Sequence, residues 1–243
     1  MTSAALDGTF VLVFARSVGL VARAPGFSHP SVPAVVRAGF ALALALAVAP
    51  SVAPVRLGPA ALAFAAAGDL AIGAAIGVGA SLLYDGAYFA GRTIDDYLGV
   101  RGSVPGANVT SAQAFGRLWS SVFLAAFVLL DGWVPVVRAF AESFARVAPG
   151  GAVAADAWMR YALMLPGTIL RAAFAVATPA IAVAAVLQLS LAAVTRIVPR
   201  FASFTLAFPV VFAAVLVVTL AAVPLLAPLG ARPWLVVPWG GAP

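Results

Sequence analysis

The chain has 243 residues, of which 64% are hydrophobic and 9% are charged, and its net charge is +6. Soluble domains contain roughly 45–50% apolar and about 25% charged residues, so a soluble protein of this length would expose large apolar patches. The composition therefore excludes an ordinary soluble enzyme and predicts an integral membrane protein. The residue alternation of barrel strands is absent, so we expect an all-α protein with about six apolar blocks.

Proline and glycine residues divide the first half of the chain into predicted helices. The first runs from about residue 8 to 24, and the second from about 34 to 48. The third block, from about 59 to 98, would form a helix about 60 Å long, twice the thickness of the hydrocarbon core. This block is either a hairpin folded near Gly68 and Asp69, or one long helix that leaves the bilayer and is covered by other protein.

A polar link at about 99–111 separates this block from the next predicted helix. That helix runs from about 112 to 130 and breaks at Asp131. The stretch that follows is amphipathic, with charged residues four apart on one face and Phe140 and Phe144 on another.

The remaining chain contains two further apolar blocks. The fifth block, from about 156 to 198, is expected to be interrupted by Pro166 and Pro179. The last is an apolar pair from about 204 to 229. With no internal repeat and no low-complexity linker, residues 1–243 are interpreted as a single membrane domain.

Asp69 is a carboxylate inside an apolar block, followed by Gly73 and Gly77 at the spacing of a Gly-x-x-x-Gly face. Small residues at that spacing let a neighbouring helix approach closely. Intramembrane carboxylates are candidates for ion coupling by default. The alternative is an acid hydrogen-bonded by its neighbours or wetted at the interface, and we favour this because no cation lies within a few turns in the sequence.

A denser group of charges, Asp85, Arg92, Asp95 and Asp96, follows in the same block. Arg92 and Asp96 are four residues apart and are expected to pair along a helix. The group is superficially similar to the carboxylate motif of phospholipid-head-group transferases. The spacing of that motif is not met, so the geometry for binding two metal ions fails.

No other residues assemble a catalytic set. His29 is the only histidine, and its place beside Pro30 in a turn predicts a solvated loop residue rather than one member of a Ser/His pair. The chain has no cysteine, which excludes a thiolate metal site and a cysteine nucleophile. We expect no enzymatic activity and no cofactor.

Four short motifs follow one another along most of the chain. They are PGFSHPSVPAVVRAGFALALALAVAP from residue 25, GDLAIGAAIGVG from 68, AGRTIDDYLG from 90 and RIVPRFASFTLAFP from 196. In this order and spacing the pattern resembles the FliR/SctT subunits of the type III protein export gate. The matching residues are Pro25, Pro33, Arg37, Gly39, Pro50, Gly73, Gly77, Gly91, Ile94, Asp95, Gly99, Arg196, Pro199, Phe204 and Pro209, and Asp69 stands where the family usually has Glu or Gln.

The resemblance implies a structural subunit of the bacterial inner membrane. One such subunit would join several copies of two smaller helical partners, FliP/SctR-like and FliQ/SctS-like, together with an FlhB/SctU-like switch subunit. Together they would close a ring around a narrow channel through which unfolded proteins leave the cytoplasm. It further implies that energy comes from a separate ATPase and the proton gradient. Gly91 joins Gly73 and Gly77 as an expected helix-packing position.

The segment after Gly99 departs from the family pattern. The family continues with a mostly apolar plug that ends in Asp-Pro, whereas this chain reads VRGSVPGANV. Irregular backbone at membrane depth is tolerated where protein buries it or water lines it, so we expect the segment in or beside the closed pore. The residues proposed for this plug are Val100, Arg101, Gly102, Ser103, Val104, Pro105 and Gly106.

The rival hypothesis from another class is a proton- or ion-coupled secondary transporter with Asp69 and Asp85 as coupling carboxylates. Transporters of that kind usually show repeated halves with discontinuous helices in matching places. Such a repeat is absent from this sequence. The motifs do not distinguish a flagellar system from an injectisome: Ile94 and Asp95 lean slightly toward the injectisome, but some flagellar members share them.

Overall fold

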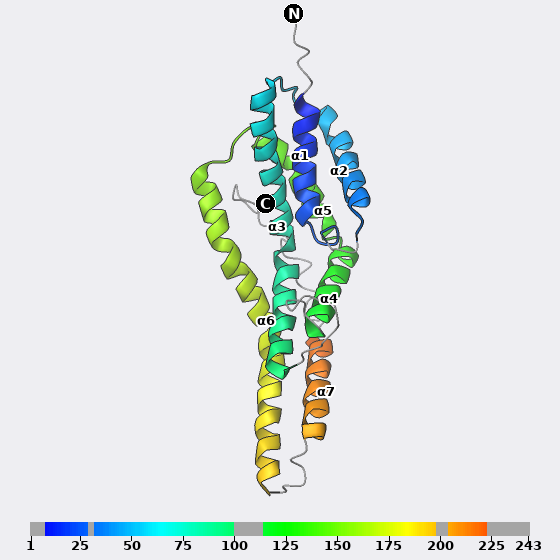
Figure 1. The fold of residues 1–243 in the computed structure, drawn as a ribbon, viewed down its shortest axis with the longest axis vertical. Coiled ribbons are helices and arrows are strands. Elements are labelled where there is room, and N and C mark those ends of the chain that lie inside the picture. Colours follow the sequence, from blue (N-terminus) through cyan, green and yellow to red (C-terminus); the bar gives the residue numbers. More distant parts are fainter. Residues whose placement is uncertain (1–7, 29–31, 100–113, 198–203, 223–243) are drawn as a thin grey trace, which may run out of the picture. The chain divides into compact units, whose positions relative to one another are not determined.

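The computed structural model describes residues 8–28, 32–99, 114–197 and 204–222, and in 204–208 and at 222 it describes the backbone alone. Helices joined by turns and irregular loops make up these residues, and no strand occurs among them, which confirms the all-α prediction (Figure 1). The helices are α1 (Gly8–Arg23), α2 (Ala34–Val48), the 3₁₀ turn η1 (Ala49–Ser51), α3 (Pro59–Leu98), α4 (Phe115–Leu129), α5 (Trp133–Arg146), α6 (Ala155–Ile197) and α7 (Phe204–Ala222).

The third apolar block is one helix rather than a hairpin. Helix α3 contains 40 residues and passes through Gly68 and Asp69 without a break. It begins at Pro59, where a missing backbone N–H costs nothing because the first helical N–H groups have no partner within the helix. No further proline occurs in it, so the hydrogen-bond ladder can continue to Leu98.

The expected interruption of the fifth block is wrong. Helix α6 contains 43 residues and remains helical through Pro166 and Pro179. A proline inside a helix removes one backbone hydrogen bond, but ending the helix would free several backbone groups at once. In apolar surroundings water is not there to bind them, so continuing the helix costs less than breaking it.

Three described segments are long and apolar enough to cross a membrane: Ala34–Ser51, α3 and α6. If the bent pair α4 and α5 forms one span, the described residues contain four candidate spans. Helix α1, with 16 residues, is shorter. Only part of the expected last pair is described, and the apolar helical part there is Pro209–Ala221.

The chain divides into two compact units. Among the described residues, the first unit contains those up to Leu82 together with Phe127–Pro166. Helix α1 lies beside both α2 and α3 here (Figure 1). The hydroxyl of Tyr161, at the start of α6, donates to the carbonyl oxygen of Ala75 on α3 at 2.6 Å. Among the fully buried apolar side chains of this unit are Leu12, Val13, Ile76 and Phe140.

The amphipathic prediction for α5 is confirmed in this first unit. Phe140 and Phe144 are buried, whereas the charged residues Arg138, Glu142 and Arg146 are exposed. Helix α5 therefore packs its aromatic face inward, and this face lies close to the charged cluster described below.

The second unit contains Leu83–Ala126 and the described residues from Gly167 onward. Helices α3 and α6 pack closely here, since a Cβ at Gly86 would lie 2.6 Å from the Cβ of Ala172. On α6 the buried residues are small and recur at helical spacing, whereas large neighbours such as Phe174 and Leu189 are exposed. The buried small residues are Ala173, Ala177, Ala180 and Ala184.

Candidate functional site

Helices α1 and α3 meet backbone to backbone along a seam of glycines. A Cβ at Gly73 would overlap the backbone carbonyl of Arg16 and lie 2.9 Å from the backbone nitrogen of Leu20. One turn later, a Cβ at Gly77 would lie 2.7 Å from the carbonyl oxygen of Leu20. On the α1 side, a Cβ at Gly19 would lie 2.7 Å from the backbone nitrogen of Ala74. Small residues on both helices therefore set the distance between them.

This close approach brings Arg16 of α1 to Asp69 of α3. The Nε of Arg16 donates to Oδ1 of Asp69 at 2.7 Å, and its Nη2 reaches the same oxygen. Both side chains are 0% exposed. The two residues are 53 positions apart, so a search for a cation within a few turns of Asp69 misses this partner. The available signal is one arginine on the buried face of α1, between Leu12 and Leu20.

The ion pair is the centre of a larger polar cluster. The Nη1 of Arg16 donates to the Oγ of Ser143 and to the carbonyl oxygen of Val147, each at 3.0 Å. The ring of Phe144 lies 4.1 Å from the guanidinium carbon, a cation–π distance. The second carboxylate oxygen of Asp69 accepts the N–H of Gly150 at 2.8 Å. The cluster thus ties α1, α3 and α5 to the turn before α6.

These contacts define what the Asp69 carboxylate can do chemically. Both of its oxygens accept hydrogen bonds, one from a guanidinium and one from a backbone amide. A buried charge is tolerated when it is paired and hydrogen-bonded in this way. The geometry fits a permanent tie between helices better than an exchangeable ion or proton site.

A second carboxylate, Asp95, joins α3 to α4 in the other unit. It is 3% exposed, and its oxygens accept the backbone N–H groups of Ala114 at 3.3 Å, Phe115 at 2.9 Å and Gly116 at 3.1 Å. One turn earlier, a Cβ at Gly91 would overlap the carbonyl of Phe115. The third motif therefore places a glycine and a carboxylate on the α3 face that receives the start of α4.

The neighbouring charges lie differently. Arg92 and Asp96 pair at 4.0 Å as expected, with side chains 39% and 73% exposed. Asp85 is half-buried on α3. Within the described ranges, no group of three or more His, Cys, Asp or Glu side chains is placed to hold a metal ion.

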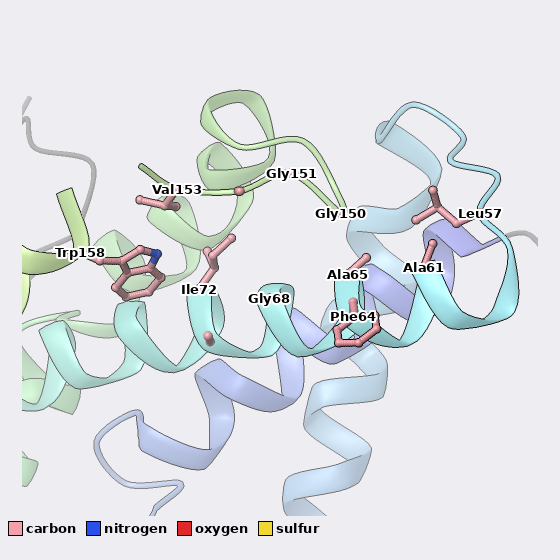
Figure 2. A pocket seen from close by; sticks show the side chains of 12 residues that line it. Leu57, Ala61, Phe64, Ala65, Gly68, Ile72, Gly150, Gly151, Val153 and Trp158 are labelled. Atoms are coloured by element: carbon pink, nitrogen blue, oxygen red, sulfur yellow. The ribbon is translucent and has the colours of Figure 1, made fainter. Parts of the chain in front are cut away.

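An apolar groove of about 500 Å³ runs along the first half of α3 (Figure 2). Gly68 of α3 lines it together with Gly150 and Gly151 of the turn before α6. Trp158 lies toward one end and Leu57 toward the other (Figure 2). The groove belongs to the first unit, beside the backbone amide that binds Asp69.

The other motif positions are spread over the fold. Pro25 is buried just after α1, Pro33 precedes α2, Arg37 and Gly39 lie on α2, and Pro50 lies in η1. Gly99 follows α3 with φ +68°, Arg196 is exposed near the end of α6, Phe204 begins α7, and Pro209 lies inside it. His29, Pro199 and the seven proposed plug residues lie outside the described residues.

A family model described as "Bacterial export proteins, family 1" matches residues 8–234 of the chain. The match spans both compact units and all of the described helices. A search of curated proteins finds no match.

Proposed function

This chain belongs to family 1 of the bacterial export proteins, the FliR/SctT family of type III export proteins, and we propose that it is a structural subunit of a type III export gate. A role in protein export follows from the family itself. The proposal adds that the chain helps to form and seal a channel in the bacterial inner membrane. Unfolded protein substrates of a flagellum or an injectisome pass through that channel.

The observation that carries the proposal is the mismatch between helix length and bilayer thickness. Helices α3 and α6 contain 40 and 43 residues, which corresponds to about 60–65 Å against about 30 Å of hydrocarbon. Within the chain, only 33% of the most apolar window of α3 and 22% of that of α6 are buried. Lipid can cover about half of each helix, so the remaining apolar surface requires protein partners.

Helical membrane partners suit this surface best. Leu163, Phe174 and Leu189 are 73%, 63% and 73% exposed along α6. Lipid-embedded helices associate through close packing, and this chain already packs its own helices through Gly and Ala. The partners proposed are FliP/SctR-like and FliQ/SctS-like subunits, together with an FlhB/SctU-like switch subunit.

The transporter hypothesis receives less support. A coupling carboxylate has to exchange its proton or ion during transport, and Asp69 is held by Arg16 and by the Gly150 amide. Such a carboxylate serves assembly of the helices better than solute coupling.

The proposal is tested by producing the chain alone and together with its two smaller partner subunits. Alone, the chain should aggregate or bind variable amounts of detergent, because its partner faces are uncovered. With both partners it should appear in a single large complex, detected by size-exclusion chromatography and native mass spectrometry. Production with one partner at a time serves as the matched control.

A different outcome would contradict the gate. If the chain alone were a stable monomer that took up a small solute with saturable kinetics, and neither partner changed its size, the transporter hypothesis would replace it.

A further inference from the structure

Asp95 lies on α3 and binds the first turn of the neighbouring helix α4. It lies one turn before the end of α3 and is 3% exposed. Its Oδ1 accepts the N–H of Phe115 at 2.9 Å, and its Oδ2 accepts the N–H groups of Gly116 at 3.1 Å and Ala114 at 3.3 Å. One side chain therefore binds three successive backbone donors of a neighbouring helix.

The start of α4 needs such an acceptor. The first N–H groups of a helix have no partner within the helix, and a Ser, Thr, Asp or Asn just before it usually accepts one of them. In this chain the residue before Phe115 is Ala114, whose side chain cannot accept a hydrogen bond. Asp95 supplies the missing acceptor, and its negative charge also suits the positive end of the helix dipole.

Gly91 sets the distance at the same contact. It lies four residues before Asp95, on the same face of α3. A Cβ at Gly91 would overlap the carbonyl of Phe115 and lie 2.5 Å from the Cα of Gly116. The glycine allows the backbones to touch, and the carboxylate holds the first turn of α4 in one orientation.

The contact brings the end of α3 and the start of α4 together. Helix α3 ends at Leu98, and Gly99 turns the chain with φ +68° while its N–H donates to the Asp96 carbonyl oxygen at 3.3 Å. Helix α4 begins against Asp95, one turn before that end. The chain therefore leaves α3 and enters α4 at one fixed place.

We propose that Asp95 is a positioning residue of the export gate, which locks the start of α4 onto the end of α3 and thereby keeps the closed channel tight. Its task is to hold backbone, not to bind a proton or an ion. This inference rests on the proposed gate function for its effect on leakage. The attachment of α4 to Asp95 can be measured whether or not the chain forms a gate.

The first test compares Asp95→Ala with Asp96→Ala in the assembled complex. Asp96 is the adjacent carboxylate, but its side chain is 73% exposed and pairs with Arg92, one turn earlier on the same helix. Asp95→Ala should speed hydrogen exchange of the Phe115 and Gly116 amides by roughly tenfold or more, since each loses a hydrogen bond to a charged acceptor. It should also let a small dye leak through the closed gate, whereas Asp96→Ala should change neither.

Two further variants separate positioning from simple helix capping. Asp95→Asn keeps the shape and one acceptor oxygen, so its exchange and leakage should lie between native and Asp95→Ala. It also keeps the test usable if Asp95→Ala fails to assemble. Ala114→Ser added to Asp95→Ala restores a cap to α4 without restoring the tie to α3, so leakage should persist.

Unchanged exchange at Phe115 and Gly116 in Asp95→Ala, or full recovery by Ala114→Ser, would overturn the inference. Deletion of residues 101–106 distinguishes this from failure of the gate proposal. If the deletion leaks and Asp95→Ala does not, the positioning role is wrong and the gate stands. If neither leaks but exchange rises in Asp95→Ala, the lock stands and the sealing role of this region is wrong.

Discussion

Arg16 and Asp69 form an ion pair between α1 and α3 in which neither side chain is exposed to solvent. Each charge has further partners, because Arg16 also donates to Ser143 and Val147, and Asp69 also accepts from Gly150. Removing one member of such a pair leaves the other buried without a counter-charge. The pair therefore behaves as one unit in mutagenesis.

Asp69→Leu should destabilise the chain by about 3–5 kcal/mol, because the Arg16 guanidinium stays buried and unpaired. Asp69→Asn should also destabilise, since the amide keeps hydrogen bonds but removes the counter-charge. The double variant Arg16→Met with Asp69→Leu should recover most of the loss. Thermal unfolding of the complex in detergent measures all three.

Asp156→Asn is the matched control for this prediction. Its partner Arg160 lies four residues away, and both side chains are mostly exposed, so little change is expected. If the double variant were as unstable as Asp69→Leu alone, the hydrogen bonds to Val147 and Gly150 would matter more than the charges.

Gly73→Ala should weaken folding by about 1–3 kcal/mol, because even a methyl group there meets the backbone of Arg16. Gly68→Ala on the same helix is the control, since nothing lies within 4 Å of its Cβ position. In that open position alanine should be neutral or stabilise the helix by up to about 1 kcal/mol. The melting temperature should therefore fall in Gly73→Ala and stay the same or rise in Gly68→Ala. Equal shifts in the two variants would contradict the role of Gly73 in the close packing of α1 and α3.

Asp131 joins α4 to α5 with φ 53°, a left-handed conformation that favours glycine. Asp131→Gly should keep or raise stability, whereas Asp131→Val should lower it by about 1–2 kcal/mol, because the left-handed region tolerates Asp but crowds the branched side chain of Val against the backbone. The side chain is exposed, so loss of packing does not complicate the comparison. Equal stability of the two variants, measured by thermal unfolding, would contradict a conformational cause.

Deleting residues 101–106 should leave assembly intact and let ions or a small dye leak through the closed gate. The single substitution Arg101→Ala should by itself raise the leakage of cations, because an arginine near a pore axis repels cations. Conductance and dye-leak assays on the assembled complex measure both effects. The control is Arg196→Ala, which removes an exposed arginine near the end of α6. A correctly assembled deletion without leakage would assign the seal to the partner subunits.

Much of the fold can be predicted from the sequence because the residues that begin and end its helices act on the nearby backbone. Proline residues mark both ends of α2, and the spacing of Phe140 and Phe144 predicts that they lie on a face of α5 apart from its charged residues. Continuity of α6 through Pro166 could not be predicted in this way. A proline lowers the stability of a helix locally, but the outcome depends on how costly it is to expose backbone in the surroundings.

The contacts at the site are harder to predict because their partners are distant or carry no side-chain signal. Asp69 stands out as an acid in an apolar block, but its cation lies 53 residues earlier, on another helix. Asp95 belongs to a recognisable motif, yet its partners are backbone N–H groups around Phe115. Backbone donors are identical at every non-proline position, so no residue type marks them.

Among the described residues, the two compact units divide inside helices rather than at loops. The divisions fall after Leu82 in α3, after Ala126 in α4 and after Pro166 in α6. Backbone hydrogen bonds of an α-helix join residues four apart, so several cross each division. Proteases need a locally extended chain to cut, and none of these three places offers one. Trimming the chain at any of these three places would therefore cut through a helix, and a gene split there would sever one.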